Sequence, residues 1–229
     1  MTNTTGLVYP QKLRRLYWPF LALAEVCREV IGTVAGSFES AGNRYTIPRF
    51  VFHGPAAGVA RLRVGFFALI HGDEAAGAHT LLAMLNRLVE QPALAAGCEL
   101  ACYPLCNPTG YEDDSRHNRA GRDLDREFWL GSEQPEICIL EEELRAGRFD
   151  GIIEVHAGAA PPGRPRLVRR RARRDGGLAA PPGQAPQPFE GVFHTPVCSA
   201  PALPDEALGC ALPGLLDSVR DFVTQGKRP

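Results

Sequence analysis

The sequence has no long apolar run, no excess of charge of one sign and no internal repeat. A membrane-spanning helix needs about 20 consecutive apolar residues, and no stretch approaches that length, so we expect no membrane partner. Lys and Arg total 25 and Asp and Glu total 26, which gives a formal net charge of −1. Because binding to nucleic acid requires an excess of positive charge, we expect no nucleic-acid partner.

The cysteine pattern lacks the even-numbered framework of a disulfide-stabilised secreted protein. There are seven cysteines, and reduced thiols are typical of the cytoplasm, so we expect a cytoplasmic protein. Cys102 and Cys106 lie in an apolar stretch and are expected to be small buried side chains rather than a metal or redox pair. The N-terminal region also lacks a small-residue cleavage site after its basic and apolar residues. Its apolar spacing instead predicts a helix over 13–31, with Gly32 as its stop.

Strand patterns and helix patterns then alternate along the chain. Continuous apolar runs are typical of strands buried on both faces, and leucines at helical spacing indicate amphipathic helices. The predicted strands cover 45–53, 61–70, 98–105 and 149–155, and the predicted helices cover 77–90, 135–145 and 215–224. This alternation predicts one α/β domain over 1–229, with a mixed, mostly parallel sheet and helices on both faces.

The segment 157–188 departs from this pattern because it is rich in Gly, Pro, Ala and Arg. Such a composition predicts a long loop. An anion-binding or nucleic-acid-binding patch and a solvated basic loop are both compatible with its arginines, and we favour the solvated loop. The arginines are Arg164, Arg166, Arg169, Arg170, Arg171, Arg173 and Arg174.

Three potential metal ligands follow predicted buried strands. His71 and Glu74 come directly after the strand 61–70, and His156 comes directly after the strand 149–155. The carboxyl ends of parallel strands meet at one edge of a sheet, which is where ligands bind in open α/β folds. Two imidazoles and one carboxylate are suitable ligands for zinc and leave a fourth position open. The sequence therefore predicts one Zn²⁺ per chain, able to polarise a carbonyl group and acidify a water molecule.

Two segments resemble the zinc carboxypeptidase family, which includes the succinylglutamate desuccinylase and aspartoacylase branch. They are HGDEAAG at 71–77 and CNPTGYEDDSRHNRAGRDLDREFW at 106–129. The second is similar to the family pattern Asn-Pro-x-Gly, Arg-x-Asn and Gly-x-Asp-Leu-Asn-Arg. The resemblance runs from about residue 13 to 160, and more loosely to the C-terminus. It implies a mixed α/β fold, zinc bound by His71, Glu74 and His156, and hydrolysis of an amide bond.

The resemblance also implies roles for residues of the second segment. Arg116 would polarise the scissile carbonyl and hold the oxyanion, and Arg126 would pair with a carboxylate of the substrate. Asn118 and Asp125 occupy the other substrate-binding positions. Asp125 stands where the family pattern has Asn, and an ionised Asp repels a substrate carboxylate. Asp125 could therefore pair with Arg126 or prefer a cationic group.

The family pattern further includes a general-base glutamate near its C-terminal strand, and here the matching position is His194. A histidine could accept a proton, because its pKa lies near neutrality. Glu190 could reach the site through a shifted loop, or the base could be lost. We therefore expect a zinc-dependent hydrolase acting on an amide bond in a carboxylate-bearing peptide or acyl amino acid. The alternatives are an N-acyl amino acid deacylase and a non-catalytic zinc-binding or ligand-binding protein, and the oligomeric state stays open.

Overall fold

The computed structural model describes residues 10–58, 61–158, 166–169, 189–196, 216–217 and 220–221. Its helices are α1 (Gln11–Val26), α2 (Ala75–Glu90), α3 (Pro108–Glu112) and α4 (Pro135–Gly147), with short 3-10 turns η1 (Pro92–Ala95) and η2 (Leu124–Arg126). Its strands are β1 (Val30–Ser40), β2 (Asn43–His53), β3 (Leu62–Ala68), β4 (Cys98–Tyr103), β5 (Gly151–Gly158), β6 (Arg166–Arg169) and β7 (Phe189–Pro196).

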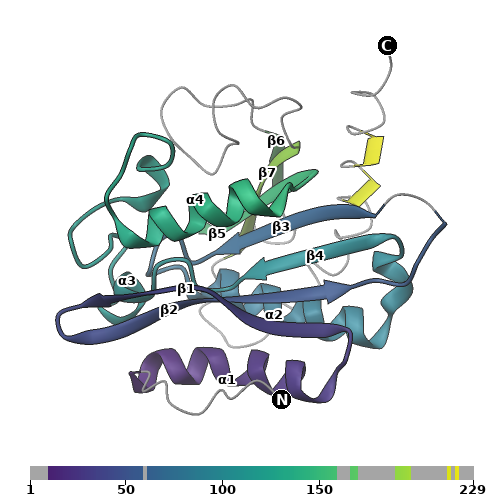
Figure 1. Cartoon of the computed structure of the whole chain (residues 1–229), viewed down its shortest axis with the longest axis horizontal. Helices are drawn as coiled ribbons and strands as arrows, with labels where there is room; N and C mark the ends of the chain where they lie inside the picture. The colour runs from purple at the N-terminus through teal and green to yellow at the C-terminus, as the bar shows by residue number, and fades with distance from the viewer. Residues whose placement is uncertain are drawn as a thin grey trace.

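The strands of the described residues form one seven-stranded sheet in the order β1-β2-β4-β3-β5-β7-β6 (Figure 1). The four central strands β4, β3, β5 and β7 are parallel, while β1, β2 and β6 add antiparallel pairs at the two sides. The predicted mixed α/β fold is therefore confirmed. The parallel strands all end at one edge of the sheet, where the sequence predicts the site.

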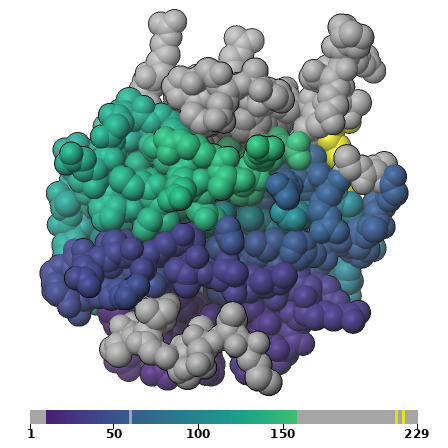
Figure 2. All heavy atoms as spheres, in the orientation of Figure 1, coloured from purple at the N-terminus to yellow at the C-terminus, as the bar shows by residue number. Residues whose placement is uncertain are grey.

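Helices cover both faces of the sheet because side chains alternate along each strand. Phe66 and Ile153 pack with α1 and α2 on one face, and Phe67 and Ile152 pack with α4 on the other. Figure 1 shows α1 below the sheet and α4 above it. Figure 2 shows from the same side that α4 and the segment before it, in green and teal, cover the molecule above the purple β1–β2 hairpin.

The predicted helix over 13–31 is wrong at its end. The helix α1 ends at Val26, and Val30 already begins β1, a strand that the sequence pattern does not predict. β1 is an edge strand whose side chains are mostly exposed or half-buried, so the alternation that marks a half-buried strand is absent. Its partner β2 follows a two-residue turn, Ala41 and Gly42, in which both residues have positive φ as this type of hairpin requires.

The other predicted elements are found within a few residues of their expected bounds, with two qualifications. Inside 157–188, where a long loop is predicted, the structure contains the end of β5 and the strand β6, and the rest of that range lies outside the described residues. Of the predicted helix over 215–224, only 216–217 and 220–221 are described, and these are helical. Cys102 and Cys106 are fully buried, as expected.

Two connections pack against each other where the parallel strands end. The amide nitrogen of Asn107 donates to the carbonyl of Ile70 at 3.2 Å, and its amide oxygen accepts from the backbone of Gly110 at 2.8 Å. A Cβ added at Gly72 would overlap the backbone of Gly110 and Tyr111. The turn after β3 and the start of α3 therefore approach so closely that only glycine fits at position 72.

Replacing Gly72 with Ala should destabilise the fold by about 1–3 kcal/mol, the usual cost of forcing extra atoms into a packed region. Chemical denaturation of the metal-free protein measures this. Gly131→Asn is the control, because Gly131 has open space around it and a positive φ that Asn tolerates. Equal stability of the Gly72→Ala variant and the wild type would contradict the close approach of the two connections.

Candidate metal centre

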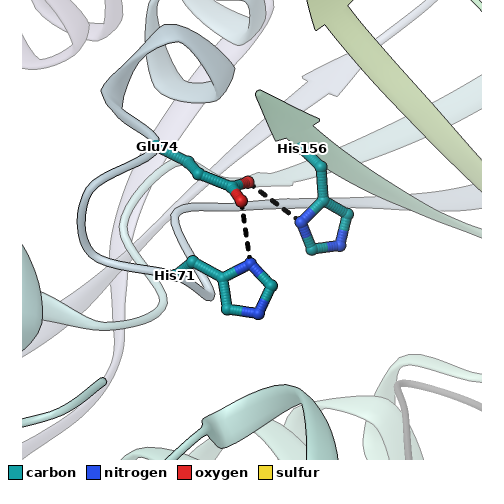
Figure 3. Close-up of side chains that lie close together, drawn as sticks. All are labelled: His71, Glu74 and His156. Atoms are coloured by element: carbon teal, nitrogen blue, oxygen red, sulfur yellow. Dashed lines mark hydrogen bonds and ion pairs between the residues drawn. The ribbon is translucent and has the colours of Figure 1, made fainter. Parts of the chain in front are cut away.

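Three elements place the predicted ligands side by side (Figure 3). His71 lies in the turn after β3, Glu74 directly precedes α2, and His156 lies near the end of β5. The strands β3 and β5 are parallel neighbours, with Ala68 opposite Val155, so both histidines reach the same edge of the sheet. One nitrogen or oxygen atom from each of the three side chains lies within 4.8 Å of the others.

The Glu74 carboxylate lies between the two imidazoles. His71 Nδ1 is 2.9 Å from Glu74 Oε1, and His156 Nδ1 is 2.9 Å from Glu74 Oε2. The backbone N–H of Ala157 also donates to Glu74 Oε2 at 2.9 Å. The carboxylate is thus oriented by two side chains and one backbone group before any ligand binds.

The charges of the site stabilise one another despite burial. Burial raises the pKa of Glu74, but the hydrogen bonds and charges of His156 and His71 outweigh it and lower this pKa to about 2. For His156, burial lowers the pKa, while the neighbouring Glu154 and Glu74 carboxylates outweigh it and raise the pKa to about 9. The site therefore has the negative potential that attracts a cation.

The donor set fits a single zinc ion. Both Nδ1 atoms and both carboxylate oxygens of Glu74 face one another, and imidazole nitrogen with carboxylate oxygen is a common zinc ligand combination. In a tetrahedral site with bonds of about 2.0–2.2 Å, ligand atoms lie roughly 3–3.5 Å apart. The separations of 2.9 Å therefore need only a small expansion to admit the ion.

Carboxylates also lie behind both imidazoles. His71 Nε2 is 3.4 Å from Asp123 Oδ1, and His156 Nε2 is 3.4 Å from Glu154 Oε2, with the Glu154 side chain only 6% exposed. Glu154 has hydrogen-bond geometry to His156 Nε2, and a carboxylate in this position fixes the tautomer and orientation of a metal-ligating histidine. Asp123 Oδ1 lies at ion-pair distance from His71 Nε2 but does not form a hydrogen bond with it, so its negative charge is what it contributes. Neither residue is among the site residues predicted from the sequence. Asp123 stands in the Gly-x-Asp part of the family-like pattern, and Glu154 lies two residues before His156 on the same face of β5, which is the signal that could have identified it.

Asp125, Glu154 and His156 form a second group with metal-ligating atoms within 4.8 Å of one another. This group shares His156 with the first. A neutral imidazole has only one acceptor nitrogen, so His156 cannot bind one metal through Nδ1 and another through Nε2. Within the described residues the two groups therefore exclude each other, and the contacts favour a metal on the Nδ1 side of His156 with Glu154 accepting the Nε2 proton.

The two predicted arginines are both anchored on Asp123. Arg116 Nη2 lies 3.4 Å and Arg126 Nε 3.6 Å from Asp123 Oδ2, and Arg116 Nη1 lies 3.9 Å from Glu74. The Arg116 side chain is 45% exposed, so its guanidinium lies beside Glu74 and is also accessible to solvent. The Arg126 side chain is 79% exposed and points further into solvent.

Asn118 is placed differently from the arginines. Its side chain is buried and donates to Gln134 at 2.8 Å and to Glu136 at 3.3 Å, and it accepts from the backbone of Arg122 at 3.0 Å. The amide thereby joins the loop before η2 to the start of α4. A contact of Asn118 with substrate stays a prediction from the motif.

The backbone register separates the two candidate general bases on β7. His194 lies directly opposite His156 on the neighbouring strand β5, at the edge of the sheet where His71 and Glu74 also lie. Glu190 lies opposite Ile152, four residues earlier, which is about 13 Å further down the strand. The register therefore brings position 194, and not position 190, to the level of the site.

Several solved structures that are named as metallopeptidases or carboxypeptidases share the architecture of this chain. A predicted metallopeptidase of Shewanella denitrificans OS217 is similar with 19% identity and a TM-score of 0.63, over 92% of this chain and 90% of its own. A metallo-carboxypeptidase of Burkholderia cenocepacia gives 14% identity and a TM-score of 0.69, over 94% of this chain and 70% of its own. Carboxypeptidase A of Helicoverpa armigera gives 16% identity and a TM-score of 0.60, over 91% of this chain and 72% of its own.

These similarities establish a zinc-carboxypeptidase fold for this chain and confirm the resemblance predicted from its motifs. No family model matches the sequence, and no curated protein matches it significantly. Within the described residues, none of the helices has both the length and the apolar character that crossing a bilayer requires.

Replacing Asp123 with Asn should weaken zinc binding by about 10- to 100-fold, the usual effect of losing a carboxylate behind a ligating histidine. Competition titration with a chromophoric chelator measures the affinity. Glu143→Gln is the control, because Glu143 accepts from Tyr103 and Arg49 away from the ligands. An unchanged affinity in the Asp123→Asn variant would show that Asp123 does not support His71.

Zinc affinity should also depend on pH. The pKa of His156 in the metal-free protein is raised to about 9, so zinc must displace its proton at neutral pH. The apparent affinity should rise about tenfold per pH unit between about pH 7 and 9 and then level off. Glu154→Gln should move the plateau to lower pH because it removes one of the carboxylates that raise this pKa. A flat profile across this range would refute a protonated His156.

Proposed function

We propose that this chain is a zinc-dependent hydrolase that cleaves an amide bond in a carboxylate-bearing peptide or acyl amino acid. The observation that carries the proposal is the convergence of His71, Glu74 and His156 at the edge of the sheet, beside the half-exposed guanidinium of Arg116. The metallopeptidase fold of the structural neighbours supports the same reaction class. We also propose a cytoplasmic location, which is supported by the five free cysteines among the described residues.

The residues of the site have different roles in the proposed reaction. Zinc, when bound, would acidify a water molecule and polarise the scissile carbonyl. Arg116 borders the ligands through Glu74 and Asp123 and can donate charge-assisted hydrogen bonds to the carbonyl oxygen as it becomes negative. Arg126, further out, can pair with the substrate carboxylate and so orient the amide bond.

Metal content and turnover test the proposal together. The wild type, purified without chelator, should contain about one zinc per chain by elemental mass spectrometry. The double variant His71→Ala, His156→Ala should retain less than a tenth of that amount and lose activity, since it lacks both imidazole ligands. His53→Ala is the matched control, because His53 lies beside Glu99 at the opposite end of the sheet.

A substrate panel separates the alternatives. Peptides with a free C-terminal carboxylate, the same peptides amidated, and N-acyl amino acids are compared on the zinc-loaded protein. Turnover of peptides alone supports a carboxypeptidase, and turnover of N-acyl amino acids alone supports a deacylase. A fully loaded protein without turnover on any of them would leave a non-catalytic zinc-binding protein. Full zinc content in the double variant would overturn the ligand assignment itself.

A further inference from the structure

The metal centre does not account for the buried carboxylate of Glu136. This residue is the second of α4, it is only 1% exposed, and it forms no ion pair with any described residue. A buried carboxylate is costly unless hydrogen-bond donors compensate its charge. Burial raises the pKa of Glu136, and the donors that face it, its own backbone N–H and the side chains of Thr109 and Asn118, act in the opposite direction. These donors show what the carboxylate holds in place.

The two oxygens of Glu136 bind two parts of the segment between β4 and η2. The Thr109 hydroxyl donates to Oε1 at 3.0 Å, and the Asn118 amide donates to Oε2 at 3.3 Å. Both donors are also fixed from behind. Thr109 Oγ1 accepts from the backbone N–H of Arg119 at 3.2 Å, and Asn118 Oδ1 accepts from that of Arg122 at 3.0 Å. One carboxylate thus holds this segment at the start of α3 and again at Asn118.

Arg116 lies inside the segment that Glu136 holds. Its backbone carbonyl accepts from the backbone N–H of Gly72 at 3.3 Å and from the Asn107 amide at 3.5 Å. Gly72 directly follows the proposed ligand His71, so this carbonyl joins the segment to the turn after β3. The backbone that carries the Arg116 side chain is thereby held at the ligand turn on one side and by Glu136 on the other.

We infer that Glu136 is a positioning residue for Arg116 that holds its loop at the metal centre, an inference that rests on the proposed hydrolase function. Arg116 would donate to the carbonyl oxygen as it becomes negative, and such stabilisation depends on donors that are fixed in advance. A Gln at position 136 has the same shape, but its N–H₂ group cannot accept a hydrogen bond. Either Thr109 or Asn118 then loses its acceptor, and the loop is released on one side.

Kinetics of the zinc-loaded protein test the role. Glu136→Gln should lower kcat by about tenfold to 10²-fold, the scale of a small misplacement of a catalytic group, while zinc content stays at about one per chain. The Kd of the carboxylate product of the best panel substrate, measured by calorimetry, should stay close to that of the wild type. The reason is that Arg126 lies on η2, which Leu124 anchors separately in the core.

A double-mutant cycle separates positioning from a general structural effect. In the Arg116→Ala background, Glu136→Gln should change kcat little, because residues that act through one another are not additive. Glu133→Gln is the matched control, because Glu133 is an exposed glutamate three residues earlier in the chain.

Hydrogen exchange of the metal-free protein reports on the loop without any turnover. Glu136→Gln should lower the protection of the backbone amides of Arg119 and Arg122, whose acceptors are the side chains that Glu136 holds. Combining it with Asn118→Asp exchanges donor and acceptor between the two positions. This double variant should restore the protection, because the Gln amide can then donate to the Asp carboxylate.

Defined outcomes would overturn the inference. Wild-type kcat in Glu136→Gln, or equal losses of kcat in the wild-type and Arg116→Ala backgrounds, would remove the positioning role. Unchanged exchange, or no restoration in the double variant with Asn118→Asp, would show that Glu136 does not hold the loop. A zinc-loaded wild type without turnover on any panel substrate would instead refute the proposed function and the positioning role with it, and the exchange measurement would still show whether Glu136 holds the loop.

Discussion

The hydrogen bonds between one carboxylate and two imidazoles define the geometry of this site. Glu74 contacts His71 within the turn after β3 and His156 on β5, with both separations at 2.9 Å. The three residues belong to a turn, the start of a helix and the end of a strand. The sheet brings these three elements close to one another, and the hydrogen bonds fix the relative positions of their side chains. Because the groups are buried, each charge depends on the others for compensation.

A second set of contacts links His71 to two arginines of the loop. Asp123 lies near His71 Nε2 with one oxygen and near Arg116 and Arg126 with the other. One carboxylate therefore lies beside an imidazole and at the same time pairs with two guanidinium groups. The loop that carries Asp123 acts as part of the rigid site because its Leu124 is packed in the core.

The sequence was sufficient to predict those parts of the site that follow from strand ends. His71, Glu74 and His156 each lie at or just beyond an apolar run, and parallel strands bring such positions together. The sequence was insufficient where a turn determines the direction of a side chain or where a strand lies at the edge of the sheet. The strand β1 has exposed side chains and no apolar alternation.

The Arg126 side chain points into solvent because of its place in the 3-10 turn η2. The Asn118 side chain is buried because it donates a hydrogen bond to Glu136 at the start of α4. No periodicity in the sequence encodes these orientations. Glu154 could have been found from its period-two spacing to His156, whereas Asp125 and Glu154 come together only through the folded loop.

The distribution of charge around the ligands restricts how a substrate can approach. On the Nε2 side of His156 lie two carboxylates, Glu154 and Asp125, which repel a substrate carboxylate. On the solvent side lie Arg116 and Arg126, both partly compensated by Asp123. A carboxylate-bearing substrate would therefore enter with its charged end toward the arginines and its amide bond toward the ligands.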